Sequence, residues 1–148
     1  MKRISIFLII LVVLAQADFT RINGIVKDLS TGLEWQDSYN ANGDAVKVAT
    51  WENSITYCTN LGSGGWRLPN IRELNSITDL STSSPTINSI FQNVITTYPY
   101  WSSTSSHQYP DTAYIVNFLS GSYINYSKRN IENQNLDSFA AVRCVRGN

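Results

Sequence analysis

The feature that most constrains the fold is a pair of cysteines, Cys58 and Cys144, the only two in the chain. An even number of cysteines in an exported chain indicates a structural disulfide. A metal site would need more ligands than two cysteines and one distant histidine provide, and redox pairs are normally close in sequence. We therefore expect one bridge that closes most of the chain into a loop. In chain-entropy models, a bridge across such a long loop stabilises the folded state by about 4 kcal/mol.

The first 17 residues predict export. A basic start precedes an apolar run over residues 4–14, and "AQA" at residues 15–17 offers a small-residue cleavage site. This is the layout of a secretory signal peptide. An uncleaved anchor is the disfavoured alternative, because the run is shorter than the roughly 20 residues that span a bilayer. We expect cleavage after Ala17 and a location in the periplasm, at the cell surface or outside the cell.

The mature chain, residues 18–148, is predicted to form a single domain with little net charge. Cleavage removes two basic residues and leaves nine Lys and Arg against eleven Asp and Glu, a net charge of −2. This value argues against nucleic acid or a membrane surface as a partner bound through bulk charge. We expect irregular loops at residues 80–85, "LSTSSP", and residues 130–137, "NIENQNLD".

The rest of the chain predicts mixed helix and strand. Residues 22–37 indicate two short strands joined near Gly32, and residues 112–127 indicate a hairpin that turns at Gly121. Residues 138–147, "SFAAVRCVRG", alternate well enough for one continuous strand, which would place Arg143 and Cys144 on opposite faces.

One helix is predicted after Thr50, which can cap it, and before Gly62, which can end it. Its apolar residues recur at spacings of three and four, so that Cys58 faces the core. That position makes a bridge to a distant strand plausible.

Residues 64–79, "GGWRLPNIRELNSITD", predict a rigid corner where a strand turns into a second helix. Apolar residues alternate with Arg67 as in a strand, and a proline then removes a backbone donor. Asn70, with Glu73 three residues later, forms a capping box. None of these residues is an obvious nucleophile or base, so we interpret the segment as structural. The structural-motif residues are Trp66, Arg67, Leu68, Pro69, Asn70, Glu73 and, further along, Trp101.

Arg67 is expected to be at least partly buried within this corner. A buried guanidinium group is costly unless it is paired. The candidate partners are Glu73 and Asp79.

Five segments in order resemble the Lcl C-terminal domain family of bacterial exported proteins: "VKDLSTGLEWQ", "TWENSITYCTNL", "GGWRLPNIREL", "YWSSTSS" and "AAVRCVRG". The resemblance covers nearly the whole mature chain. The corner and residues 143–146 are also similar to sulfatase-modifying, formylglycine-generating enzymes. The resemblance implies an α+β fold of the C-type-lectin-like kind, with two helices flanking a small, mostly antiparallel sheet and the termini close together. It also implies that Cys58 on the first helix bridges to Cys144 on the last strand.

The resemblance supports two functional hypotheses. The first is an exported, non-catalytic recognition or adhesion domain that binds glycan or protein at the cell surface or in the periplasm, with no cofactor. The alternative is an enzyme of the sulfatase-modifying type. The enzyme relatives use cysteines beyond the bridge, and this chain has none to spare. A hydrolase triad is also disfavoured, because the only histidine, His107, lies in an expected loop and no orienting group can be named.

No metal site is expected either. Residues 37–44, "DSYNANGD", carry oxygen ligands and a glycine but lack the spacing of a calcium-binding EF-hand loop. We interpret this segment as a polar turn.

The candidates for ligand binding are aromatic and basic side chains near loops. Residues 96–111, "TTYPYWSSTSSHQYPD", place tyrosines among small polar residues, and such rings stack on sugars or contact proteins. The basic pair after the hairpin could contact a sulfate or carboxylate, or could be an ordinary solvated pair. We expect the loops before Trp101, at 105–111 and at 128–137 to gather at one end of the sheet and bind an acidic glycan or a surface protein. The candidate residues are Tyr98, Tyr100, Tyr109, Lys128 and Arg129.

Overall fold

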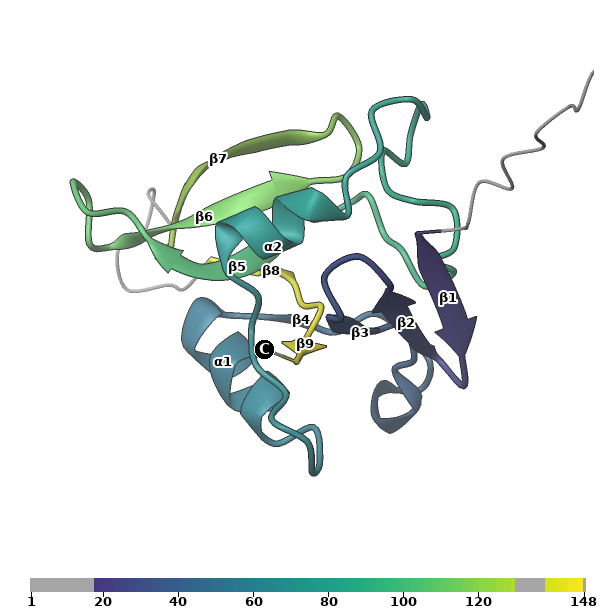
Figure 1. Ribbon diagram of the computed structural model, residues 1–148. Coiled ribbons are helices and arrows are strands. Elements are labelled where there is room, and N and C mark those ends of the chain that lie inside the picture. Colours follow the sequence, from purple (N-terminus) through teal and green to yellow (C-terminus); the bar gives the residue numbers. More distant parts are fainter. Residues whose placement is uncertain (1–17, 130–137, 148) are drawn as a thin grey trace, which may run out of the picture.

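The computed structural model describes residues 18–129 and 138–147, which form two sheets and two short helices (Figure 1). The predicted α+β class is confirmed, but the one expected sheet is two. The four-stranded sheet has the order β1 (Phe19–Ile22), β2 (Ile25–Asp28), β3 (Glu34–Gln36) and β9 (Val145–Arg146). The five-stranded sheet has the order β4 (Val48–Ala49), β8 (Ala140–Ala141), β5 (Tyr100–Ser105), β6 (Thr112–Asn117) and β7 (Ser122–Ser127). Among the described strands, all pairings are antiparallel except that of β5 with β8.

The hairpin of β2 and β3 forms where the sequence predicts it. The carboxylate of Asp28 accepts hydrogen bonds from the backbone amides and hydroxyls of Ser30 and Thr31, which fixes the turn. Burial alone would raise the pKa of Asp28, but these hydrogen bonds outweigh it and lower the pKa. The predicted hairpin of β6 and β7 is also present, in an unbroken register that pairs Thr112 with Ser127 and Asn117 with Ser122. β1, which the sequence did not predict, adds to the edge of β2.

Both predicted helices are present and begin at the predicted caps. α1 (Trp51–Thr59) begins after Thr50, whose side chain accepts a hydrogen bond from the amide of Asn53. It ends at Thr59, before the glycine that was expected to end it. α2 (Ile71–Ser76) is a single short helix within the corner at residues 64–79.

The two helices lie on opposite faces of the five-stranded sheet (Figure 1). Alternate residues of a strand point to opposite faces, and the two hydrophobic cores follow this rule. Leu74 of α2 packs in one core with Tyr100 and Val116, whereas Cys58 of α1 packs in the other with Trp101 and Ile115. Each helix therefore covers its own side of the strands β5 and β6.

The C-terminal segment is not the single strand that its alternation predicted. Residues 140–145 are all buried, because this segment crosses from the five-stranded sheet at β8 to the four-stranded sheet at β9. Within the crossing, the carbonyl of Val142 accepts from the hydroxyl of Tyr39, and the carbonyl of Cys144 accepts from the amide of Gln36. A segment packed between two sheets has neighbours on all sides, so alternation does not sort its residues into inner and outer faces.

Cys58 and Cys144 form the expected disulfide, which joins α1 to the crossing segment. A disulfide in a chain of this kind is consistent with a location outside the cytoplasm. None of the helices in the described part of the chain is long and apolar enough to cross a membrane. The predicted signal peptide at residues 1–17 lies outside the described residues.

Candidate functional site

The corner at residues 64–79 is fastened by a bidentate ion pair. Arg67 Nη1 and Nη2 donate to the two carboxylate oxygens of Glu73, at 2.8 and 2.7 Å. The Asn70 side chain accepts from the Glu73 amide, and the Glu73 carboxylate accepts from the Asn70 amide, both at 2.9 Å. The capping box and the expected partner of Arg67 are therefore both confirmed. The other candidate partner, Asp79, instead accepts hydrogen bonds from Ser81.

The electrostatics of the corner match a structural role. Burial alone would raise the pKa of Glu73, but hydrogen bonds from Arg67 and from the amide of Asn70 outweigh it and lower the pKa. The hydrogen bonds to Glu73 likewise raise the pKa of Arg67. Both side chains are charged near neutral pH, and their donors and acceptors are directed at each other.

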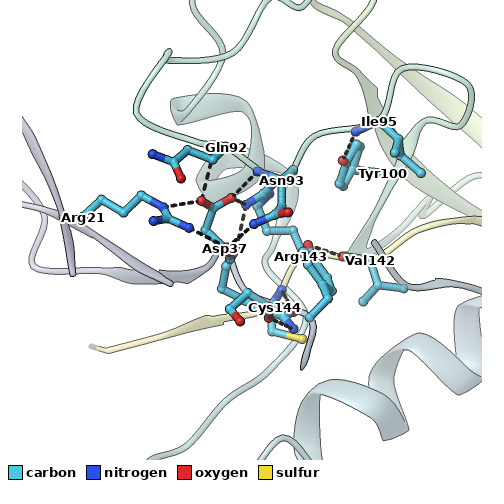
Figure 2. Close-up of polar contacts among 12 residues, drawn as sticks. Arg21, Asp37, Gln92, Asn93, Ile95, Tyr100, Val142, Arg143 and Cys144 are labelled. Carbon is cyan, nitrogen blue, oxygen red and sulfur yellow. Dashed lines mark hydrogen bonds and ion pairs between the residues drawn. The ribbon is translucent and has the colours of Figure 1, made fainter. Parts of the chain in front are cut away.

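A second arginine–carboxylate cluster, which we call the Asp37 hub, is deeply buried and was not predicted from the sequence. Asp37, directly after β3, has no exposed side-chain surface, and its carboxylate accepts four hydrogen bonds (Figure 2). Two come from guanidinium groups, Arg21 Nε at 2.6 Å and Arg143 Nη1 at 3.1 Å. Two more come from the backbone amides of Gln92 and Asn93. The hub ties β1, the crossing segment and the loop before β5 to the end of β3.

Arg143 is the central cation of the Asp37 hub. Its side chain is completely buried, and it also donates to the backbone carbonyls of Gln36 and Asn93. The guanidinium carbon lies 4.7 Å from the ring centroid of Phe91 and 5.7 Å from that of Tyr100. These contacts give a buried charge both hydrogen-bond partners and a π-electron environment.

The charge of Arg143 is maintained by its neighbours. Burial alone would lower the pKa of Arg143, but Tyr39, Tyr100 and Asp37 outweigh this effect and raise it. Burial in turn raises the pKa of the Tyr39 phenol. Arg143 therefore keeps its charge at the centre of the Asp37 hub.

The segment 37–44 is only partly the polar turn that was expected. Asp37 is withdrawn into the hub and Tyr39 is buried, while Asn40–Asn42 form a single 3-10 turn, η1. Among the described residues, no three or more His, Cys, Asp and Glu side chains lie close enough together to hold a metal ion.

Tyr100 was predicted to contact a ligand, and this prediction is wrong. Its ring is fully buried against Phe118, and its hydroxyl accepts from the amide of Ile95. Tyr100 and Trp101 follow one another in a strand, and each points into one of the two cores. Trp101, expected in the core, is buried there and donates to the carbonyl of Ala49.

The three loops expected at one end of the sheet do not all gather there. Tyr98 is 42% exposed but precedes β5, whereas Tyr109 is 55% exposed and follows β5. β5 is six residues long, so these two tyrosines lie at opposite ends of the strand. His107 is exposed in the same loop as Tyr109. The loop at residues 130–137 lies outside the described residues.

Loop 106–111 and the end of β7 do come together, because antiparallel pairing places the start of β6 beside the end of β7. Lys128 donates from its backbone amide to the carbonyl of Asp111 and from Nζ to that of Pro110. Tyr109 directly precedes Pro110, Arg129 directly follows Lys128, and both residues are exposed. We call the side chains of Tyr109, Lys128 and Arg129 the Tyr109 surface.

Lys128 is more constrained than a solvated surface lysine. Its Nζ lies 3.7 Å from the ring centroid of Trp51 and also donates to Ser105 Oγ at 2.9 Å. The indole of Trp51 donates in turn to the carbonyl of Ser102. Lys128 therefore fixes the backbone of the Tyr109 surface, and Arg129 is the exposed residue of the basic pair.

A groove that the sequence did not indicate lies between α2 and the strands β5, β6 and β7. Its volume is about 440 Å³. We call it the α2–β7 groove. Its lining residues are Ile71, Arg72, Asn75, Thr104, Tyr114 and Tyr123. These residues come from four elements, so the sequence carried only a weak signal for the groove. That signal was the polar side of α2, which indicates a helix side that is not packed against the core.

The part of the chain that the structure describes is a mixed α+β domain of two sheets and two helices, stabilised by one disulfide. The family model of the Lcl C-terminal domain matches residues 24–146, and the chain belongs to that family. No curated protein matches the chain.

Proposed function

We propose that this chain is an exported recognition domain that binds a glycan or a protein without catalysing a reaction. Its membership of the Lcl C-terminal domain family and its disulfide support an extracytoplasmic role. The observation that carries the proposal is the Tyr109 surface, where an exposed ring and an exposed guanidinium group are held on a fixed backbone.

The preorganisation of this surface favours binding. The amide of Tyr109 donates to Ser106 Oγ, and its carbonyl accepts from both the amide and the hydroxyl of Thr112. A loop that is already ordered loses less conformational entropy when it binds a ligand. Loops on a rigid scaffold commonly carry binding residues for this reason.

The chemistry of the Tyr109 surface fits an acidic glycan. A tyrosine ring offers a flat face with a polar edge, and the guanidinium of Arg129 matches a sulfate or carboxylate through paired hydrogen bonds. Binding should therefore weaken as salt rises, since charges at a surface are screened over about 8 Å at physiological ionic strength.

We also infer a C-type-lectin-like arrangement for this domain. Three features support it: helices on opposite faces of the central sheet, first and last described strands in one sheet, and a bridge from the first helix to the C-terminal segment. The fold is shared with the sulfatase-modifying alternative, but two other observations weigh against that alternative. Both cysteines are joined to each other, and the two arginine–carboxylate clusters are internally paired.

The proposal is tested with the mature domain on an array of sulfated, carboxylated and neutral glycans. The double variant Tyr109→Ala/Arg129→Ala should not bind the acidic glycans that the parent binds. The matched control, Tyr98→Ala/Lys27→Ala, removes one exposed tyrosine and one exposed cation elsewhere and should bind as the parent does. Equal binding by the parent and the Tyr109→Ala/Arg129→Ala variant would show that the site lies elsewhere.

A further inference from the structure

The α2–β7 groove has the size and the chemistry of a ligand site separate from the Tyr109 surface. Its volume of about 440 Å³ lies within the range of roughly 300–1,000 Å³ that is usual for small-molecule sites. Five of its six lining residues are uncharged. Recognition there would consequently depend on shape, ring contacts and hydrogen bonds more than on charge.

Two tyrosines form one side of the groove. Tyr114 on β6 pairs with Asn125 on β7, and Tyr123 lies two residues before Asn125 on the same face of the sheet. Such diagonal neighbours are roughly 7–8 Å apart, within reach of long side chains. Tyr123 is 57% exposed on the edge strand, so its ring is accessible to a ligand in the groove.

The polar side of α2 forms the opposite wall. Arg72 and Asn75 are three residues apart on the helix, which places their side chains on the same side. Neither side chain makes a hydrogen bond or an ion pair with the described part of the chain, in contrast to Glu73 between them, which is held by Arg67. The hydroxyls of the two tyrosines also lack hydrogen-bond partners among the described residues.

We infer that the α2–β7 groove binds a neutral pyranose sugar. The C–H groups of a pyranose face carry a small positive charge, which suits the negative face of a tyrosine ring. Its hydroxyl groups both donate and accept, and they can satisfy the amide of Asn75 and the guanidinium of Arg72. This site differs from the Tyr109 surface in residues and in ligand charge, and so the two proposals stand or fall separately.

The test is a nuclear magnetic resonance titration of the mature domain with methyl glycosides of glucose, galactose, mannose and N-acetylglucosamine. At least one glycoside should shift the amide signals of residues 71–75, 114 and 123. The shifts should not depend on salt between about 0.05 and 0.5 M, because no charge on the ligand is screened.

Two neighbouring residues of β7 provide a matched pair of variants. Tyr123 and Ile124 are 57% and 56% exposed, and adjacent residues of a strand face opposite sides of the sheet. Tyr123→Ala should weaken binding of the glycoside about tenfold or more, whereas Ile124→Ala should change it by less than about twofold. Asn75→Ala, on the helix, provides a second loss-of-binding variant if Tyr123→Ala does not fold.

Three results would overturn the inference. One is the absence of shifts in the groove with every glycoside, and another is equal weakening by Ile124→Ala and Tyr123→Ala. The third is a response only to an anionic probe, methyl glucuronide, that disappears at high salt. That last result would assign the groove to charge recognition by Arg72.

Discussion

Arg67 and Arg143 both pair with a carboxylate, but only one of them remains in contact with water. The side chain of Arg67 is 40% exposed, and its partner Glu73 is six residues away. The side chain of Arg143 is fully buried, and its partner Asp37 is 106 residues away. The first pair stiffens one corner, whereas the second joins segments from across the chain. Burial and sequence separation should therefore set how much each pair contributes to stability.

The largest effect is expected from Arg143→Ala. The change removes one of the two guanidinium partners of Asp37 and leaves the carbonyls of Gln36 and Asn93 without that donor. Breaking a buried pair in this way costs about 3–5 kcal/mol. Urea unfolding followed by tryptophan fluorescence measures this loss directly. If the free energy of unfolding fell by no more than it does in Arg67→Ala, the contrast between the two clusters would be wrong.

A double-mutant cycle with Asp37→Asn and Arg143→Met sharpens this comparison. The two side chains contact each other, so their effects should not add. We expect the double variant to lose less stability than the two single variants together. Strict additivity would mean that Asp37 and Arg143 act independently.

The disulfide fastens the same crossing segment, because Cys144 directly follows Arg143. The double variant Cys58→Ala/Cys144→Ala should lose about 2–5 kcal/mol, measured in the same urea experiment. Labelling the unfolded, unreduced parent should detect no free thiol. Two reactive thiols in protein isolated from an oxidising compartment would contradict the bridge.

The sequence could predict the corner because its contacts are local. Arg67, Asn70 and Glu73 lie within seven residues, and the capping box has a recognisable spacing. The hairpins and the cap of α1 were predictable for the same reason. The single pair of cysteines left only one possible bridge within the chain.

The Asp37 hub could not be predicted because its partners are brought together only by the finished fold. Arg21, Asp37, Asn93 and Arg143 come from four distant parts of the chain. The one signal was an arginine within an otherwise apolar run at residues 139–145. That run was interpreted as an alternating strand, since nothing local shows that it crosses between two sheets. The α2–β7 groove also escaped prediction, because four separate elements line it.

Arg67→Ala should have a smaller effect than any change in the Asp37 hub. Losing hydrogen bonds to a charged partner costs about 1–3 kcal/mol, which corresponds to several degrees in the melting temperature of a domain of this size. Thermal unfolding measured by circular dichroism tests this. An unchanged melting temperature combined with altered ligand binding would show that the corner is a functional site and not a structural one.

The corner should also contribute to sensitivity toward acid. The folded-state pKa of Glu73 is lowered from its ordinary value of 4.5. The stability that this shift provides is present at pH values above the ordinary pKa of Glu73. It is lost as the pH falls through the lowered pKa of the folded state. Melting temperatures between about pH 7 and pH 3 should therefore fall less steeply in Arg67→Ala than in the parent. Parallel curves would show that Arg67 does not lower the pKa of Glu73.

The smallest effect on stability, and the largest on binding, is expected at the Tyr109 surface, which lies outside both arginine clusters. The most direct test compares the melting temperature and the affinity for an acidic glycan identified on the array, in the parent, Arg67→Ala and Tyr109→Ala/Arg129→Ala. A recognition domain of the proposed kind predicts a lower melting temperature with retained binding for Arg67→Ala, and an unchanged melting temperature with lost binding for the double variant. Full affinity in a folded Tyr109→Ala/Arg129→Ala protein would contradict the proposed site.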